Sequence, residues 1–345
     1  MRILFIKLSS IGDIVHTLPA LAAVRRRMPD AHIAWAVDSR YAEILRGNEL
    51  IDDLIELDTR SLAGGKTIEG ILLDVTSQLN RVRKAKFDVT LDFQGLWKSA
   101  FVGKFSGAKE RWGFSKDALR EPSSRMLLTH TANVDDGIHV IRKNLELASQ
   151  ALKFYIADEE PSFPIFTAQA NVAEAEAIAA KAGGKFAILN PGGGWVTKLW
   201  PAENFGALAA MLRSELGIVS VITSGPGDAE LAKSAAAADN TKTAIIAEPS
   251  LKALYELAKR ASVYIGGDTG PTHIAAAAGT RAVGLFGPTE WWRNGTLNQK
   301  DICVERSDIG CRVNCHRRTC DKWICMDISV ETVFDAVKAR LASDE

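Results

Sequence analysis

The sequence predicts an α/β protein built from two halves, each containing a parallel β-sheet flanked by helices. Strand-like apolar runs alternate with helix-like segments along the whole chain. The length of 345 residues suffices for about two domains of ordinary size. Residues 157–164 contain three acidic residues and two prolines, which makes this segment the best candidate for a linker between the halves.

The strands expected in the first half are Ile3–Leu8, His32–Val37, Leu54–Leu57 and Val89–Phe93. A helix-like pattern runs from Ile14 to Arg26, just after a Gly12-Asp13 turn. In the second half we expect strands at Phe186–Asn190, Val219–Thr223, Val263–Gly266 and Ala282–Phe286, with alanine-rich helices such as Asn171–Ala182 and Glu230–Ala238. Parallel sheets bind ligands beyond the carboxyl ends of their strands, so the loops that follow these strands are the candidate sites.

The composition is that of a globular protein without overall charge. Apolar residues make up 47% of the chain, and 42 basic residues balance 42 acidic ones. This balance gives no indication of nucleic-acid binding. No apolar run approaches the roughly 18 residues that span a bilayer. The apolar N-terminus is broken by Lys7 and lacks a cleavage pattern, so we expect a cytoplasmic protein.

The first candidate site is the turn Ser9-Ser10-Ile11-Gly12-Asp13, directly after the first expected strand. Gly12 permits a close approach of backbone to ligand. Asp13 stands at a helix start, where the helix dipole favours an ionised carboxylate that can accept a proton from a sugar hydroxyl. The alternative is that Asp13 or Ser10 only caps the helix. This segment alone favours capping, and it contains neither a P-loop nor a dinucleotide fingerprint.

The second candidate site is the glycine-rich segment Asn190–Pro201. Its three successive glycines leave backbone N–H groups available to an anion, and Lys198 adds a positive charge. A flexible connection with Lys198 in solvent explains this segment equally well. A third loop, Ser224–Glu230, offers acidic groups that could bind ribose hydroxyls, although Asp228 is equally plausible as an N-cap.

The fourth candidate site is Gly266–Ala277, where a helix is expected to begin near Pro271. Backbone N–H groups at such a helix start bind anions, and His273 lies in the first turn. Asp268 or Thr269 could instead be a simple N-cap. The combination of glycines, hydroxyl, proline and histidine favours an anion site over capping.

Taken together, these segments resemble glycosyltransferase family 9, the ADP-heptose:lipopolysaccharide heptosyltransferases, and most closely the heptosyltransferase I type. The resemblance runs over nearly the whole chain. It rests on an ordered set of motifs at Lys7–Ala20, Asp92–Ser99, Arg120–Pro122, His139–Arg142, Asp268–His273 and Phe286–Thr289.

The resemblance implies a GT-B fold, in which two Rossmann-like domains with parallel sheets face each other across a cleft. Residues 1–157 would form the acceptor-binding domain and residues 158–330 the nucleotide-sugar domain. The last helix, within 331–345, would pack back onto the N-terminal domain.

The resemblance also implies an inverting, metal-independent transfer of heptose from ADP-heptose to the Kdo region of lipid A, with Asp13 as the base and no cofactor. The implied donor-binding residues are Thr197, Lys198, Glu230, Asp268, Thr269, Gly270 and His273. The implied acceptor-binding residues are Ser9, Ser10, Gly12, Arg60, Lys66 and Arg120. We expect a monomer that works peripherally on the cytoplasmic face of the inner membrane.

Two features depart from the heptosyltransferase I pattern. The family's ribose-binding glutamate falls near Ala229 or Glu230, so Glu230 is assigned by proximity alone. A cysteine cluster occupies positions 311, 315, 320 and 325. These thiols could form a structural zinc site, but their spacings are not the usual C-x-x-C pairs, and free or paired thiols are the alternative. The four residues are Cys311, Cys315, Cys320 and Cys325.

Three other functions compete with this hypothesis. Another family 9 transferase would use a different acceptor or nucleotide sugar. A GT-B-like nucleotide-sugar epimerase would need catalytic carboxylates on both domains, whereas Asp13 opposite a lone diphosphate site favours transfer. A non-catalytic nucleotide-binding module would not depend on Asp13 at all.

Overall fold

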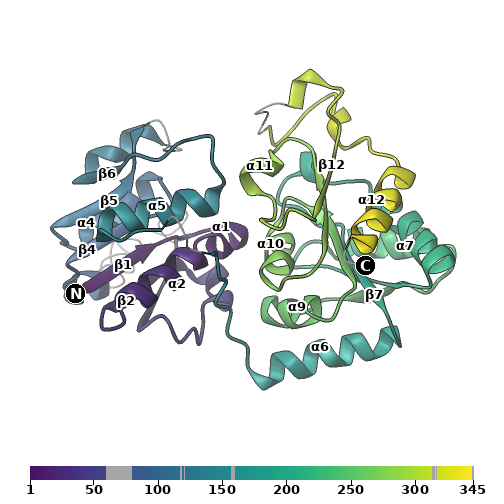
Figure 1. The fold of residues 1–345 in the computed structure, drawn as a ribbon, viewed down its shortest axis with the longest axis horizontal. Helices are drawn as coiled ribbons and strands as arrows, with labels where there is room; N and C mark the ends of the chain where they lie inside the picture. The colour runs from purple at the N-terminus through teal and green to yellow at the C-terminus, as the bar shows by residue number, and fades with distance from the viewer. Residues whose placement is uncertain are drawn as a thin grey trace, which may run out of the picture. The chain divides into compact units, whose positions relative to one another are not determined.

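The computed structural model describes residues 1–59, 80–116, 119, 121–156, 160–312, 315 and 317–343. The chain divides into two compact units, Met1–Phe166 and Thr167–Glu345. Each unit contains a six-stranded parallel sheet with helices packed against it (Figure 1).

The described part of the expected linker, residues 160–164, belongs to the N-terminal unit rather than to the second domain. The side-chain amide of Asn48 donates a 2.7 Å hydrogen bond to the carbonyl of Pro164. The guanidinium of Arg26 lies 3.4 Å from the Ser162 hydroxyl. These bonds attach the segment to the first unit, so the unit boundary lies at Phe166 and Thr167.

The N-terminal sheet has the strand order β3-β2-β1-β4-β5-β6. Its strands are β1 (Arg2–Ile6), β2 (His32–Asp38), β3 (Asp53–Leu57), β4 (Val89–Asp92), β5 (Glu110–Phe114) and β6 (His130–Ala132). The helices of this unit include α1 (Ile11–Val15), α2 (Leu18–Arg27), α4 (Trp97–Phe105) and α5 (Val140–Leu152), with 3₁₀ helices η1 (Ser39–Ile44) and η3 (Pro122–Leu127). Strand β1 is almost wholly apolar and lies at the centre of the sheet, which explains its nearly complete burial.

The helix expected from Ile14 to Arg26 is instead two helices, α1 and α2. Pro19 stands in the first turn of α2, where its missing N–H costs nothing. Helix α1 begins at Ile11, so Gly12 and Asp13 lie inside its first turn rather than before it. The prediction was therefore wrong about where the first helix begins.

The C-terminal sheet has the strand order β12-β11-β10-β7-β8-β9. Its strands are β7 (Phe186–Asn190), β8 (Val219–Thr223), β9 (Ile245–Ala247), β10 (Val263–Gly267), β11 (Ala282–Phe286) and β12 (Ile302–Glu305). The helices of this unit include α6 (Gln169–Ala182), α7 (Ala202–Leu216), α8 (Ala229–Ala238), α9 (Leu251–Ala258), α10 (Gly270–Ala277), α11 (Trp291–Asn294) and α12 (Val330–Ala342), with short 3₁₀ helices η4 (Val196–Lys198), η5 (Gly310–Arg312) and η6 (Ile324–Met326).

The last helix, α12, packs on the core of the C-terminal unit. Its buried side chains Val333, Phe334 and Val337 belong to the hydrophobic core of the C-terminal unit. The buried guanidinium of Arg340 forms a 2.7 Å ion pair with Asp301, just before β12. An apolar stripe and a buried charge pair therefore bind α12 to the C-terminal unit.

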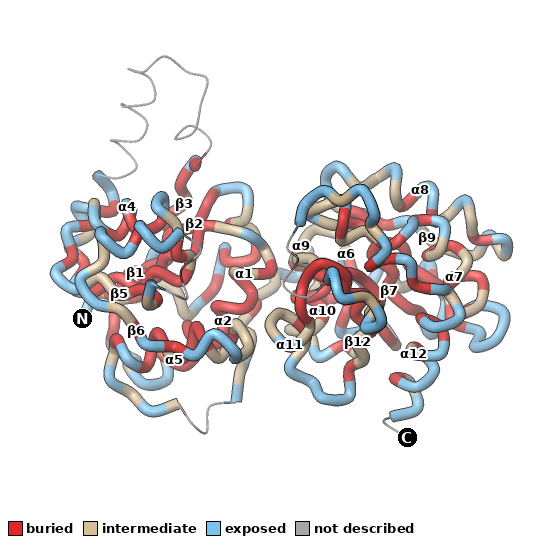
Figure 2. Tube along the Cα trace, turned by 90° about the horizontal axis from the view of Figure 1, so that it is seen from above, coloured by how far each residue is buried: buried red, intermediate tan, exposed pale blue. Residues whose placement is uncertain are grey.

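The two sheets share one doubly wound topology. In each sheet, the first strand of the unit lies in the middle. The order in which strands are added reverses beside it, between β1 and β4 in one unit and between β7 and β10 in the other. The strands are buried in both units and the outer sides of the helices are exposed (Figure 2). Ligands of such sheets bind at the carboxyl ends of the strands where the order reverses. The topology therefore marks one candidate edge in each unit.

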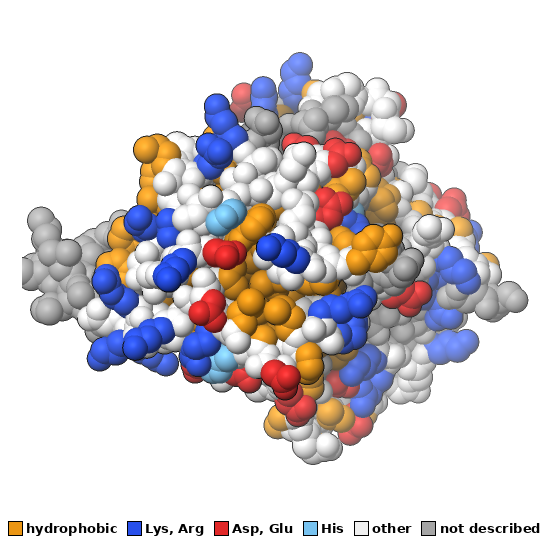
Figure 3. All heavy atoms as spheres, turned by 60° about the vertical axis from the view of Figure 1, so that its left-hand side comes forward, with side chains coloured by type: hydrophobic (Ala, Val, Ile, Leu, Met, Phe, Trp, Pro, Cys, Tyr) orange, Lys and Arg blue, Asp and Glu red, His pale blue; other side chains and the backbone are white. Residues whose placement is uncertain are grey.

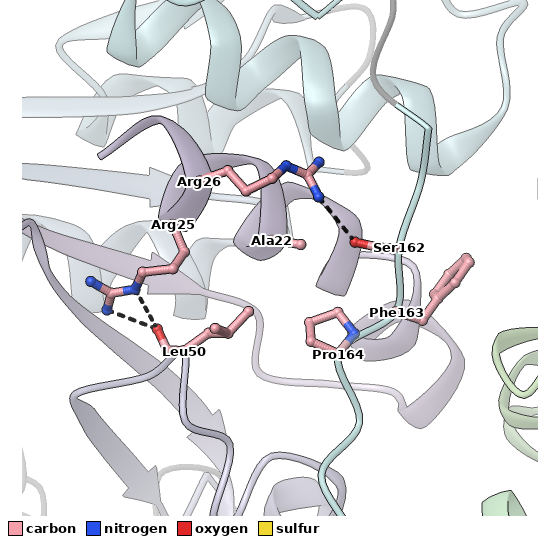
Figure 4. A pocket seen from close by; sticks show the side chains of 7 residues that line it. All are labelled: Ala22, Arg25, Arg26, Leu50, Ser162, Phe163 and Pro164. Atoms are coloured by element: carbon pink, nitrogen blue, oxygen red, sulfur yellow. Dashed lines mark hydrogen bonds between the residues drawn. The ribbon is translucent and has the colours of Figure 1, made fainter. Parts of the chain in front are cut away.

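A surface pocket of about 290 Å³ lies where the linker packs on the N-terminal unit (Figure 4). It is lined by Ala22, Arg25, Arg26, Leu50, Ser162, Phe163 and Pro164. Leu50 precedes β3 and Arg25 lies near the end of α2, so the pocket sits at the amino ends of the strands. It therefore lies away from the edge at which this fold binds ligands. Within the ranges that the structure describes, no helix is both long and apolar enough to cross a membrane.

Candidate active site

Asp13 lies at the reversal point of the N-terminal sheet, in the first turn of α1, the helix that follows β1. Its carboxylate accepts hydrogen bonds from the backbone N–H and the hydroxyl of Ser10, at 3.1 and 2.9 Å. The other carboxylate oxygen lies 3.5 Å from the ammonium of Lys7. The Asp13 side chain is 43% exposed. Asp13 thus makes the capping contacts that the sequence suggested and is also accessible to a substrate.

Lys7 was not among the site residues predicted from the sequence. It is almost fully buried, and its ammonium donates a 2.8 Å hydrogen bond to the carbonyl of Phe93 at the end of β4. A buried ammonium 3.5 Å from a carboxylate favours the ionised form of that carboxylate. Lys7 therefore places a positive charge beside the carboxylate of Asp13.

The Asp92-Phe93-Gln94-Gly95 segment holds the Asp13 loop in place. The side-chain oxygen of Gln94 accepts hydrogen bonds from the backbone N–H groups of Leu8 and Ser9, both at 3.0 Å. Asp92 is buried and accepts hydrogen bonds from the backbone N–H of Gln94 and Gly95 and from the Ser99 hydroxyl. Burial raises the pKa of Asp92 to about 6, even though these bonds act in the opposite direction. Through Gln94, this motif holds the backbone that precedes Asp13 in place.

The expected acceptor-binding residues fall into two groups. Ser9, Ser10 and Gly12 lie within or beside the turn that carries Asp13. Arg60, Lys66 and Arg120 lie outside the described residues.

The reversal point of the C-terminal sheet brings Lys198, Asp268 and His273 together. The Lys198 ammonium lies 2.6 Å from one Asp268 carboxylate oxygen and also donates to the Asp268 backbone carbonyl at 3.0 Å. The Nε2 atom of His273 lies 3.2 Å from the other carboxylate oxygen. Burial alone would raise the pKa of Asp268, but the His273 hydrogen bond and the Lys198 charge hold that pKa well below its usual range. The carboxylate therefore stays ionised and holds the side chains of Lys198 and His273 in place.

The helix start beside this cluster has anion-binding capacity. Thr269 is the N-cap of α10, and Pro271 occupies one of the first positions of the helix. The first backbone N–H groups of an α-helix have no partner within the helix and carry partial positive charge. Gly270 lies in this first turn, and His273 follows within the next residues of the helix. The expected diphosphate site thus combines α10, Lys198 and His273 at one strand edge.

The glycine loop after β7 lies close to the loop after β8. A Cβ atom on Gly192 would overlap a carboxylate oxygen of Asp228, so the two loops approach each other closely at this point. Burial raises the pKa of Asp228. Glu230, in contrast, is 85% exposed and pairs with Lys233 one turn along α8. Asp228 is therefore the acidic residue of this loop that borders the glycine loop.

Thr197 is anchored by the cysteine-rich segment near the C-terminus. Its hydroxyl donates a 2.6 Å hydrogen bond to the carbonyl of Arg317, and its own carbonyl accepts one from the indole N–H of Trp323 at 3.1 Å. Trp195 in the same loop stacks under two cations, with the Lys198 ammonium 4.4 Å and the Arg318 guanidinium 5.3 Å from its ring centroid. The segment thus fixes the loop that carries Lys198.

The cysteines do not form a metal site among the described residues. All five are free thiols, and no group of three or more His, Cys, Asp or Glu side chains in the described ranges is placed to hold a metal ion. Cys325 is buried, and burial raises its pKa. A Cβ atom on Gly287 would lie 3.1 Å from the Cys325 sulfur, so this thiol packs against the loop after β11. Of the four cysteines considered for a structural zinc site, Cys325 is buried, Cys315 and Cys320 are partly buried, and Cys311 is exposed.

Comparison with known proteins agrees with this arrangement. The chain is 28% identical to lipopolysaccharide heptosyltransferase 1 of Pseudomonas aeruginosa over 323 residues, covering 93% of this chain and 87% of that protein. It is also 28% identical to lipopolysaccharide heptosyltransferase 1 of Campylobacter coli over 306 residues, covering 85% and 86%. The structure of the Escherichia coli heptosyltransferase WaaC with ADP superposes with a TM-score of 0.79 at 20% identity, covering 99% of this chain and 100% of that chain.

The structural match confirms the predicted fold class, α/β of the GT-B type with two Rossmann-like domains. The sequence pattern of glycosyltransferase family 9 (heptosyltransferase) matches residues 75–323, which is well over half of the chain. With motifs in the family's order and relatives matching over most of their length, the chain belongs to glycosyltransferase family 9, the heptosyltransferases.

Proposed function

We propose that this protein transfers heptose from ADP-heptose to the Kdo region of lipid A during assembly of the lipopolysaccharide inner core. The observation that carries the proposal is the pair of sites at the sheet reversals. One holds an accessible carboxylate, and the other holds a lysine, a histidine and a helix start suited to a diphosphate. Relatives named for lipopolysaccharide heptosyltransferase 1 support the choice of sugar and pathway.

In the proposed reaction, Asp13 accepts the proton of the acceptor hydroxyl, and the hydroxyl oxygen attacks the anomeric carbon of the heptose. The bond from that carbon to the diphosphate breaks as the new bond forms, and ADP leaves. A single displacement of this kind inverts the anomeric configuration. The step needs no metal because Lys198, His273 and the first N–H groups of α10 balance the charge that grows on the leaving diphosphate.

The Asp268 carboxylate has a second role in this proposal. It already binds Lys198 and His273, but a carboxylate offers about four acceptor positions. The remaining positions can accept hydrogen bonds from hydroxyl groups of the heptose. Asp268 would then link recognition of the sugar to the placement of the cations that bind the diphosphate.

The decisive experiment measures ADP release from ADP-heptose with and without Kdo-lipid A, for the wild type and for Asp13→Asn. We expect release to require both substrates. A missing general base costs about 10²–10⁴-fold in rate, whereas ADP affinity, measured by calorimetry, should not change because Asp13 does not bind the donor in this proposal. Asp53→Asn is the matched control, since Asp53 is an exposed carboxylate of the same sheet at the start of β3.

Turnover by Asp13→Asn at the wild-type rate would remove Asp13 from the reaction. Equal ADP release without any acceptor would instead favour the epimerase-like or hydrolytic alternative. A panel of ADP-, UDP- and GDP-linked sugars separates the proposal from another family 9 activity, because the proposal expects only ADP-heptose to be consumed rapidly.

A second experiment tests the donor site. Removing Lys198 alone would leave the buried Asp268 carboxylate without its ammonium partner and endanger the fold. The double variant Lys198→Met/Asp268→Asn removes both charges together. We expect it to fold and to lose about tenfold or more in ADP affinity, the size of one charge-assisted hydrogen bond. Unchanged ADP affinity would place the diphosphate elsewhere.

A further inference from the structure

Helix α4 (Trp97–Phe105) has an unusual distribution of side chains. A surface helix normally turns its large apolar residues toward the core and its polar residues outward. In α4 the aromatic residues Trp97 and Phe101 are 43% and 48% exposed. The side against the sheet consists mostly of small residues, namely Ser99, Ala100, Val102 and Gly103.

Helix α4 packs closely on the sheet, and of its three aromatic residues only Phe105 packs against the core. A Cβ atom on Gly103 would lie 3.3 Å from side-chain atoms of Ile6 in β1 and Thr90 in β4. This spacing is tighter than most Cβ contacts, so the helix has little room for a larger side chain at position 103. The exposed aromatic residues are not a consequence of loose packing.

The outward side of α4 alternates aromatic and basic residues. At 3.6 residues per turn, Trp97, Lys98, Phe101 and Lys104 fall within an arc of about 120°. All four are exposed, and α4 contains no acidic residue. We call these four residues the aromatic–lysine face.

The neighbouring 3₁₀ helix η3 extends this face. The backbone N–H of Trp97 donates a 2.6 Å hydrogen bond to the Glu121 carboxylate, and its indole N–H donates to Ser123 at 3.0 Å. Helix η3 then presents Met126, which is 80% exposed, next to the exposed Arg125 in the sequence. Figure 3 shows one face of the molecule, on which hydrophobic side chains lie beside both basic and acidic side chains.

We propose that the aromatic–lysine face, with Arg125 and Met126, binds the surface of an anionic lipid bilayer. Aromatic rings that enter the headgroup region and lysines that remain at the phosphates are the combination found in interfacial helices. The positive charge complements anionic headgroups, and each basic residue near such a surface adds to binding. Glu121 lies beside this face as a negative charge, and its carboxylate accepts a hydrogen bond from the backbone N–H of Trp97.

The position of the face agrees with a lipid-linked acceptor, and in this respect the inference rests on the proposed function. Helix α4 begins three residues after Gln94, whose side chain binds the backbone of Leu8 and Ser9 in the Asp13 loop. A bilayer in contact with α4 would therefore present its headgroups near the base. The enzyme would act on acceptors while they remain in the membrane.

The test is co-sedimentation of the full-length protein with phosphatidylcholine vesicles that contain or lack phosphatidylglycerol. We expect binding only to the anionic vesicles, and weaker binding at higher salt. Lys104→Glu and Phe101→Ser should each lower the partition coefficient about tenfold. Both side chains are exposed, so thermal unfolding should remain as in the wild type.

The matched controls lie on the C-terminal unit. Trp292→Ser removes an equally exposed aromatic residue, and Lys181→Glu makes the same charge change on α6. Both should bind vesicles like the wild type. Equal losses in variants and controls would overturn the proposal, as would a wild type that binds no vesicles. A wild-type dimer that Phe101→Ser dissociates in ultracentrifugation would assign the face to a second copy instead.

Turnover separates this proposal from the proposed function. Phe101→Ser should retain its rate on a soluble, deacylated acceptor and lose rate on the same acceptor displayed in vesicles. Equal rates for variant and wild type in both formats would sink the membrane face and leave the transferase intact. Vesicle binding by the predicted residues without any heptose transfer would contradict the function and leave the membrane face standing.

Discussion

Lys7, Asp92 and Asp268 show how single buried charges are accommodated in this protein. The ammonium of Lys7 is bound by a carbonyl and faces a carboxylate, and Asp268 is bound by lysine and histidine. Asp92 is different, because its hydrogen bonds come from backbone N–H groups and a hydroxyl rather than from a directly bonded cation. Burial therefore dominates and raises the pKa of Asp92 to about 6, so this residue carries a testable pH dependence.

Replacing Asp92 by Asn should remove a destabilising effect that grows with pH. The folded protein holds the pKa of Asp92 at about 6, above the roughly 3.9 of an unfolded chain. The wild-type protein therefore has its full free energy of unfolding, as far as Asp92 is concerned, below about pH 4. Part of that free energy is lost as the pH rises through about 6, because the buried carboxyl group must then ionise. The Asn amide can accept from the same N–H groups and donate to Ser99. Relative to the wild type, Asp92→Asn should gain on the order of 2 kcal/mol between about pH 4 and pH 8.

Denaturant unfolding of wild type and variant at several pH values between about 4 and 8 measures this difference directly. Groups elsewhere titrate in both proteins and cancel in the comparison. A difference that stays constant over this range would contradict the assignment of the shift to Asp92.

At the scale of secondary-structure elements, close approaches between backbones fix how the helices pack. Gly206 lies in the middle of α7, where a Cβ atom would overlap the carbonyl oxygen of Ala235 in α8. Gly192 and Gly103 differ, because the atoms nearest to their positions belong to side chains. Gly206 is needed for the distance between α7 and α8 rather than for backbone flexibility.

Gly206→Ala should therefore destabilise the C-terminal unit. In an exposed helix the change would stabilise by about 1 kcal/mol through helix propensity. Here the new methyl meets backbone atoms of α8 that cannot move aside, and overpacking costs about 1–3 kcal/mol. We expect a net loss of melting temperature, measured by circular dichroism.

Gly184→Ala is the matched control, because no atom lies within 4 Å of the position that its added methyl would take and its φ is not in the left-handed region. That change should be neutral or slightly stabilising. A Gly206→Ala protein as stable as Gly184→Ala would show that α7 and α8 can separate without cost.

At the scale of the whole molecule, the chain consists of two units with one topology. Each has its own parallel sheet in the same doubly wound order. The C-terminal unit also has its own hydrophobic core, which includes Trp200, Phe205 and the buried residues of α12. A unit with a complete core is expected to fold without the rest of the chain.

The fragment 167–345, expressed alone, should therefore fold. We expect cooperative thermal unfolding and the fluorescence of a buried Trp200, which is almost inaccessible in the structure. The fragment 167–329 is its control, since it lacks α12 and exposes the core that Val333, Phe334 and Val337 cover. A 167–345 fragment without a cooperative transition, or a shorter fragment of equal stability, would contradict the role assigned to α12.

The fold was predictable where apolar strands are long and central. The expected strands at β1, β2, β4, β7, β8, β10 and β11 lie where the structure places them, because fully buried strands need continuous apolar runs. Strands β6 and β9 have only three residues, and β5 carries charged residues on an outer part of the sheet. Short or partly exposed strands leave no such run, so the sequence pattern did not reveal them.

The sequence by itself determined the alternating α/β fold, the loops that carry chemistry and the family, because these depend on local patterns and ordered motifs. Only the tertiary structure brought Lys198 to Asp268, 70 residues away, and Lys7 to Asp13 and the end of β4. It also assigned α12 to the C-terminal unit and turned the aromatic residues of α4 outward. The physical reason is that strand order and helix packing decide which distant side chains meet, and no local pattern specifies them.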